Sequence, residues 1–220
     1  MITPEIIERS KKVDPAQIGH YIESGYMHPR IKPLDETFRV LGPAFTVRLP
    51  GNDNSMLYYS MQKAPKGSVV VIDRMGEHRL ACVGEIAALA ARSRGMAGIV
   101  VDGPTTDTLP IKAMGFPVFS TGRSAVTTNL IGIDGEYDVV INCGGAVVRP
   151  GDIVFGDCDG VIVCPPDRFE EYLKKAEQAN LSEAKYRETF AKGGYITDFI
   201  DIDKLAEMDG KAILRSMANK

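Results

Sequence analysis

CVGEIAALAARSRGMAGIVVDGPTTD, residues 82–107, is the stretch that decides the fold. It predicts a helix, a tight turn, a buried strand and an acidic loop. The alanine-rich run from Ile86 to Arg94 favours helix, and Gly95 ends it in the usual way. The β-branched run 98–101 is typical of a strand that is covered on both faces.

Two carboxylates of this stretch are expected to meet. A strand at residues 68–72 precedes the helix, so the order is β-α-β and the strands should be parallel. The start of the helix and the end of the second strand then lie on one edge of the sheet, which brings Glu85 close to Asp107. Beside the N–H groups of a helix start, the pair suits a divalent cation and a small anion. Spacing alone favours an ordinary loop with solvated acids over such a site.

The composition excludes several classes of protein. The chain has 220 residues, 44% of them hydrophobic and 25% charged, which is typical of a globular protein. A net charge of −3 gives no basic footprint for nucleic acid. No apolar run approaches the length of a membrane span, and the N-terminus is too polar for a signal peptide. We therefore expect a cytoplasmic protein that binds neither nucleic acid nor membrane.

Cysteine and histidine spacing gives no metal motif. The four cysteines are expected to be buried free thiols: Cys82, Cys143, Cys158 and Cys164. The three histidines are scattered along the chain, so a histidine-rich metal site is not expected.

The rest of the chain predicts helices at both ends of a core rich in strands. A helix should begin at Pro15, capped by Asp14, and run to Gly25. Short strands flank a Gly-Pro kink in residues 38–50, and a charged helix follows Pro166. Because neither a linker nor a repeat is visible, residues 1–220 are predicted to form a single domain with a core at about 35–170.

Several segments together resemble the RraA-like family. In chain order they are Gly42-Pro43-Ala44, the polar loop 51–54, Gly84-Glu85 with RGMAGIVVDG at 94–103, FPVF at 116–119, and VRPGDIVFGDCDGV at 148–161. This family groups 4-hydroxy-4-methyl-2-oxoglutarate aldolases with proteins named for inhibiting ribonuclease E. The resemblance implies an α/β fold of the β/β/α swivelling-domain type, assembled as homotrimers or hexamers with sites between subunits.

The resemblance also implies a chemistry. The family's aldolases use Mg²⁺ or Mn²⁺ to polarise the carbonyl of a pyruvate unit. Their motif is an acid, twenty residues, then Arg-Asp, which places the catalytic acids on Glu85 and Asp107, with Asp107 as metal ligand. Backbone N–H groups after Gly84, including that of Ile86, would bind the substrate carboxylate. An acid from a neighbouring subunit is expected to complete the site, either Glu36 or one from the C-terminal helix.

One position departs from the family pattern. Thr106 stands where the aldolases have arginine, so a bidentate pair with the substrate is lost. Arg123, on a later loop, is a candidate replacement and equally a surface arginine. Two functions stay open: a metal-dependent lyase for a small 2-oxo dicarboxylate, or a non-catalytic regulator of a ribonuclease or another protein. No glycine-rich nucleotide loop supports a methyltransferase.

Overall fold

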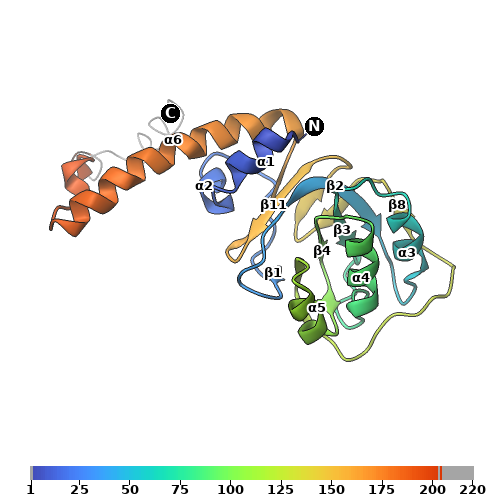
Figure 1. The fold of residues 1–220 in the computed structure, drawn as a ribbon. Helices are drawn as coiled ribbons and strands as arrows, with labels where there is room; N and C mark the ends of the chain where they lie inside the picture. Colours follow the sequence, from blue (N-terminus) through green and yellow to red (C-terminus); the bar gives the residue numbers. More distant parts are fainter. Residues whose placement is uncertain (1, 203, 205–220) are drawn as a thin grey trace. The chain divides into compact units, whose positions relative to one another are not determined.

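A computed structural model describes residues 2–202 and 204 (Figure 1). The described residues form two compact units, divided after Glu177. Residues 205–220 of the predicted single domain lie outside the described residues. In the described part of the chain, no helix is long and apolar enough to cross a membrane.

The first unit is built on one mixed sheet that curls into a nearly closed barrel. Its parallel centre consists of β2 (Val40–Arg48), β3 (Val69–Asp73), β4 (Gly98–Val101) and β6 (Val118–Ser120). Four antiparallel strands extend it: β1 (Lys32–Pro33) on β6, β8 (Glu136–Tyr137) and β11 (Ile153–Asp157) on β2, and β12 (Gly160–Cys164) on β11. The predicted α/β fold is confirmed.

Alternate residues of the central strands face two cores. Val70 and Ile72 pack with α3 (Ser55–Met61), α4 (Glu85–Ser93) and α5 (Thr108–Met114), which cover one face of the sheet (Figure 1). Val69 and Val71 pack against the hairpin of β9 (Ile141–Cys143) and β10 (Ala146–Val148) on the other face. Burial on both sides explains the continuous β-branched runs.

A third core lies beside β11 and β12. There α1 (Pro4–Ser10), α2 (Pro15–Gly19) and the first turns of α6 (Pro166–Ala191) enclose Phe155, Phe169 and Leu173. In the second unit, the rest of α6 and a short 3₁₀ helix, η1 (Ile196–Asp198), carry an aromatic cluster. Its closest pair is Tyr186 and Phe199, with ring centroids 4.5 Å apart.

Three local predictions differ from the structure. The helix that begins at Pro15 ends at Gly19 rather than Gly25, because Gly25 joins the edge of β12 and its carbonyl accepts from Val163 N at 2.6 Å. Residues 40–48 form one strand instead of two. Its Gly-Pro step lies where its pairing changes from β11 to β3, so the proline does not interrupt the strand. Cys158 is exposed in the β11–β12 turn, whereas the other three cysteines are buried and all four are free.

Candidate functional site

The site lies where the chain leaves β4 and passes the start of α4. Two short strands, β5 (Pro104–Thr105) and β7 (Gly122–Arg123), pair there in parallel. Thr105 also bridges to Val83, and Thr106 N donates to Val83 O at 3.0 Å. These contacts place Thr106 and Asp107 alongside the residues that lead into α4.

Asp107 carries its carboxylate to the start of α4. Its backbone adopts a left-handed conformation with φ of 50°, which is uncommon for a residue other than glycine. It directly precedes α5, but its side chain makes no capping bond to that helix. Instead, Oδ2 accepts from Glu85 N at 3.0 Å. The carboxylate therefore satisfies one of the unpaired N–H groups at the start of α4.

Gly84 makes room for this arrangement. A Cβ atom at residue 84 would lie 2.5 Å from Asp107 Oδ2 and 2.9 Å from Thr106 Cγ2. Both distances are shorter than any ordinary contact of a Cβ atom. Glycine is thus needed here for close approach, since its φ of −127° is open to any residue.

A cavity of about 200 Å³ opens at this point. Gly84, Ile86, Thr106 and Asp107, all predicted from the sequence, line it. The facing wall was not predicted as part of a site; its polar members are Asn54, Tyr58, Thr127 and Thr128. Asn54 and Tyr58 are four residues apart, a spacing that puts two residues on one face of a helix. This spacing was the feature of the sequence from which the wall could have been predicted.

Asn54 and Tyr58 are polar groups held in a largely buried wall. Asn54 is buried, and its Nδ2 donates to Cys82 O at 2.9 Å. Its Oδ1 is buried without a hydrogen-bond partner among the described residues. Burial, and secondarily Cys82, raises the pKa of Tyr58, so the phenol remains a proton-bearing donor.

Asp53 fixes the loop that completes this wall. Its buried carboxylate accepts from the backbone N–H groups of Ser55 at 2.9 Å, Ile131 at 3.2 Å and Ile133 at 2.6 Å. These bonds, that of Ser55 first, lower the pKa of Asp53. The segment after β7 is thereby tied to the start of α3.

The other predicted residues lie around the cavity in different ways. Glu85 contributes its backbone N–H to Asp107, and its carboxylate is not among the groups lining the cavity. Arg123 pairs with Thr105 through β7 and is exposed, but it also does not line the cavity. Glu36 is exposed on the turn before β2.

The donors present fit a magnesium-type cation. Asp107 is the one carboxylate among the described residues that line the cavity, and no lysine, arginine or histidine lines it. Asp107 Oδ1 has only a long contact, 3.5 Å from Thr106 Oγ1, so it can accept a ligand. Mg²⁺ is commonly held by one or two carboxylates together with water and substrate oxygens.

Comparisons with known proteins agree on one family. The sequence model described as RraA-like, Aldolase/RraA, matches residues 3–163. A relative from Halalkalibacterium halodurans, named "Putative 4-hydroxy-4-methyl-2-oxoglutarate aldolase", is 41% identical over 67% of this chain and 70% of its own length.

Two solved structures share the fold. RraAS2 of Streptomyces coelicolor, described as an unusual member of the RNase ES inhibitor RraA family, is 26% identical with a TM-score of 0.75, over 84% of this chain and 97% of its own. The RNA-processing inhibitor RraA of Thermus thermophilis is 25% identical with a TM-score of 0.60. The match covers 75% of this chain and 94% of that protein.

Proposed function

The chain belongs to the Aldolase/RraA family, and on that premise we propose that it is a divalent-metal-dependent lyase that cleaves a small 2-oxo dicarboxylate. The observation that carries the proposal is the carboxylate of Asp107. It is held at the N-terminus of α4 beside a cavity, and its backbone is in a strained conformation. Strain of this kind persists where the surroundings enforce it, often at functional sites.

Each group of the site has a task in this reaction. Asp107 would hold Mg²⁺ or Mn²⁺ through Oδ1, because Oδ2 is already engaged by Glu85 N. The bound cation supplies Lewis-acid polarisation of the 2-oxo group. N–H groups of the first turn of α4, those of Ile86 and Ala87, bind the adjacent carboxylate, as helix N-termini bind anions. Glu85 holds Asp107 Oδ2 through its backbone N–H, and its carboxylate lies outside the metal's own ligands.

Thr106 limits this chemistry. With threonine in the arginine position, no positive side chain of the described residues lines the cavity. Charge on the substrate is then stabilised by the cation and the helix N-terminus alone. We therefore expect weak activity on 4-hydroxy-4-methyl-2-oxoglutarate, or a preference for a related 2-oxo dicarboxylate.

The same observation favours a second candidate function. A site that lacks a positively charged side chain for the substrate suits a non-catalytic regulator of a ribonuclease or another protein. One structural neighbour is described as an unusual member of the RNase ES inhibitor RraA family, and the other as an RNA-processing inhibitor. The two functions differ in one property that can be measured directly, the metal-dependent release of pyruvate.

Assembly as a homotrimer or hexamer is part of the proposal. Large apolar side chains stand exposed on the cavity lining or within two residues of it in sequence: Ile86 is 66% exposed, Leu109 77%, Val126 60% and Leu130 71%. Exposed apolar patches of this kind mark interaction surfaces. A second copy seated there would cover them and could add an acid to the site, either Glu36 or one from α6.

The decisive experiment measures pyruvate release from oxaloacetate and from 4-hydroxy-4-methyl-2-oxoglutarate, with and without Mg²⁺. Asp107→Ala should abolish both Mg²⁺ binding and activity while leaving the fold intact. Glu8→Ala, which removes an exposed acid of α1, is the matched control and should change neither. Unchanged Mg²⁺ affinity in Asp107→Ala would show that the metal site lies elsewhere. A parent protein inactive at saturating Mg²⁺ would favour the regulator.

A further inference from the structure

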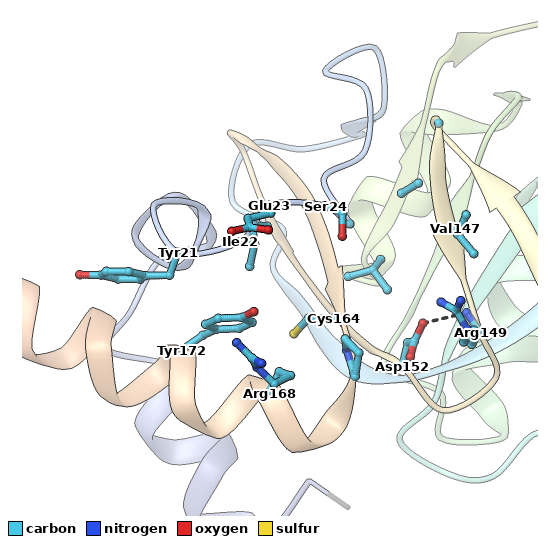
Figure 2. Close-up of a pocket in the computed structure, with 15 residues that line it drawn as sticks. Tyr21, Ile22, Glu23, Ser24, Val147, Arg149, Asp152, Cys164, Arg168 and Tyr172 are labelled. Atoms are coloured by element: carbon cyan, nitrogen blue, oxygen red, sulfur yellow. Dashed lines mark hydrogen bonds between the residues drawn. The ribbon is translucent and has the colours of Figure 1, made fainter. Parts of the chain in front are cut away.

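A second cavity of about 760 Å³ lies within the first unit, apart from the candidate site. It is enclosed by residues 21–25, the β10 end of the β9–β10 hairpin, the end of β12 and the first turns of α6 (Figure 2). None of its lining residues lines the site around Asp107. Its volume is in the range of cavities that bind small molecules.

Two arginines line this cavity from different elements. Figure 2 shows Arg168, on α6, and Arg149, after β10, on separate sides of it, with Cys164 between them. The Arg149 side chain makes no hydrogen bond or ion pair with another described residue. Arg168 bonds Glu171 through Nε at 3.3 Å, and its guanidinium lies 5.3 Å from the centre of the Tyr172 ring. Since a guanidinium has five N–H donors, most of them remain available.

The described acids that line the cavity, Asp152 and Glu23, make no ion pair with these arginines. Asp152 is buried, and its Oδ2 accepts from the backbone N–H of Arg149 at 2.8 Å, which holds the turn rather than the guanidinium. Glu23 is exposed on the facing segment and makes no ion pair with a described residue. Its repulsion of an anion is therefore reduced by solvent and salt.

We propose that this cavity binds a small dicarboxylate, with one carboxylate on Arg149 and the other on Arg168. Guanidinium groups pair with carboxylates through two parallel hydrogen bonds, and two of them on separate sides select a ligand with two separated charges. Gly145 N is not free to bind a phosphate, because it already donates to Asn142 Oδ1 at 3.1 Å.

The Cys164 thiol adds no charge to this cavity. Burial raises the pKa of the Cys164 thiol to about 12, with Asp152 and Asp167 adding to the shift. The thiol therefore stays protonated at physiological pH and adds no charge against the ligand. Tyr21 and Tyr172 supply further uncharged lining.

Calorimetric titration with succinate at 0.15 M NaCl tests the proposal on the whole chain. Arg149→Gln and Arg168→Gln should each weaken succinate binding about three- to tenfold, as expected for partly exposed ion pairs. Glu23→Gln should strengthen it, because one like charge is removed. Arg187→Gln, on the same helix but outside the cavity, is the matched control and should have no effect.

Other probes and outcomes decide against the proposal. Acetate, with one carboxylate, should bind at least tenfold more weakly than succinate. Pyrophosphate binding more tightly than succinate would overturn the ligand class. Succinate affinity that is unmeasurable in the parent, or unchanged in both Arg149→Gln and Arg168→Gln, would overturn the site. These results do not depend on lyase activity, because the titration measures binding alone.

Discussion

Replacing Gly84 by alanine tests the geometry on which the site depends. The new Cβ atom would lie 2.5 Å from Asp107 Oδ2, against an ordinary separation of 3.4–4 Å, so the oxygen must retreat by about 0.9 Å. That displacement is enough to break its 3.0 Å hydrogen bond from Glu85 N. The carboxylate is exposed and can rotate, so the steric cost itself should be small.

The two consequences have different magnitudes. Losing the carboxylate that caps α4 should cost about 1 kcal/mol, which lowers Tm by about 2–4 °C in a chain of this size. Metal affinity should suffer more, by about 10- to 100-fold, because Glu85 N–H orients the ligand. Gly84→Ala should therefore remain folded while binding Mg²⁺ poorly.

The measurements are urea unfolding and Mg²⁺ titration by calorimetry. Gly19→Ala is the matched control: a Cβ there meets nothing within 4 Å, so stability and Mg²⁺ affinity should stay at the parent's values or above. If Gly84→Ala binds Mg²⁺ with the affinity of the parent, Mg²⁺ binding does not depend on the position of the Asp107 carboxylate. A loss of several kcal/mol would instead show that the backbone, not the carboxylate, absorbs the overlap.

Four other predictions follow from the same structure. Thr106→Arg should raise kcat/KM about ten- to a hundredfold, which is the contribution of a charged hydrogen bond made in the transition state. If Arg123 already supplies that charge, Arg123→Ala should lower kcat/KM by the same factor and Thr106→Arg should change it little. Tyr58→Phe should lower kcat/KM with the fold unchanged, whereas Tyr59→Phe, on an exposed neighbour outside the cavity, should not. Light scattering at micromolar concentration should give a trimer or a multiple of it, and a monomer would contradict a shared site. Because the pKa of Asp53 is lowered in the folded protein, its carboxylate stabilises the fold at pH values above the ordinary aspartate pKa, and this stabilisation is lost as the pH falls below that pKa. In urea unfolding, Asp53→Asn should therefore reduce the dependence of the unfolding free energy on pH in the acid range.

The sequence predicted the parts of the site that follow from local order. A helix between two buried strands requires parallel pairing, and that rule alone brings residue 107 back to the start of α4. The structure has this pairing, with Val70 opposite Ile99 and Ile72 opposite Val101. What local order does not contain is the left-handed backbone of Asp107. It lies where the chain passes from β5 to α5 across only two residues, Thr106 and Asp107.

The facing wall depends on contacts between distant loops. Thr127 lies beside Ala81 through a bridge, and Asp53 reaches the backbone of residues 131–134. Neither contact produces a periodic pattern or a motif in the sequence, because each joins irregular segments about 46 to 81 residues apart. A polar loop such as 51–54 can be recognised as a loop, but its partner cannot.

Arg74 shows how much one such contact can organise. In the sequence it opens a polar turn, yet in the structure it is fully buried. Its guanidinium donates to Leu49 O and Gly51 O, both at 2.7 Å, and its Cγ lies 2.7 Å from where a Cβ on Gly103 would stand. Gly51 leads into the loop before α3, and Gly103 leads into the segment that ends at Asp107. One buried side chain thus joins the two segments that form opposite walls of the cavity. Because carbonyl oxygens accept its hydrogen bonds, the guanidinium makes this link without a carboxylate partner.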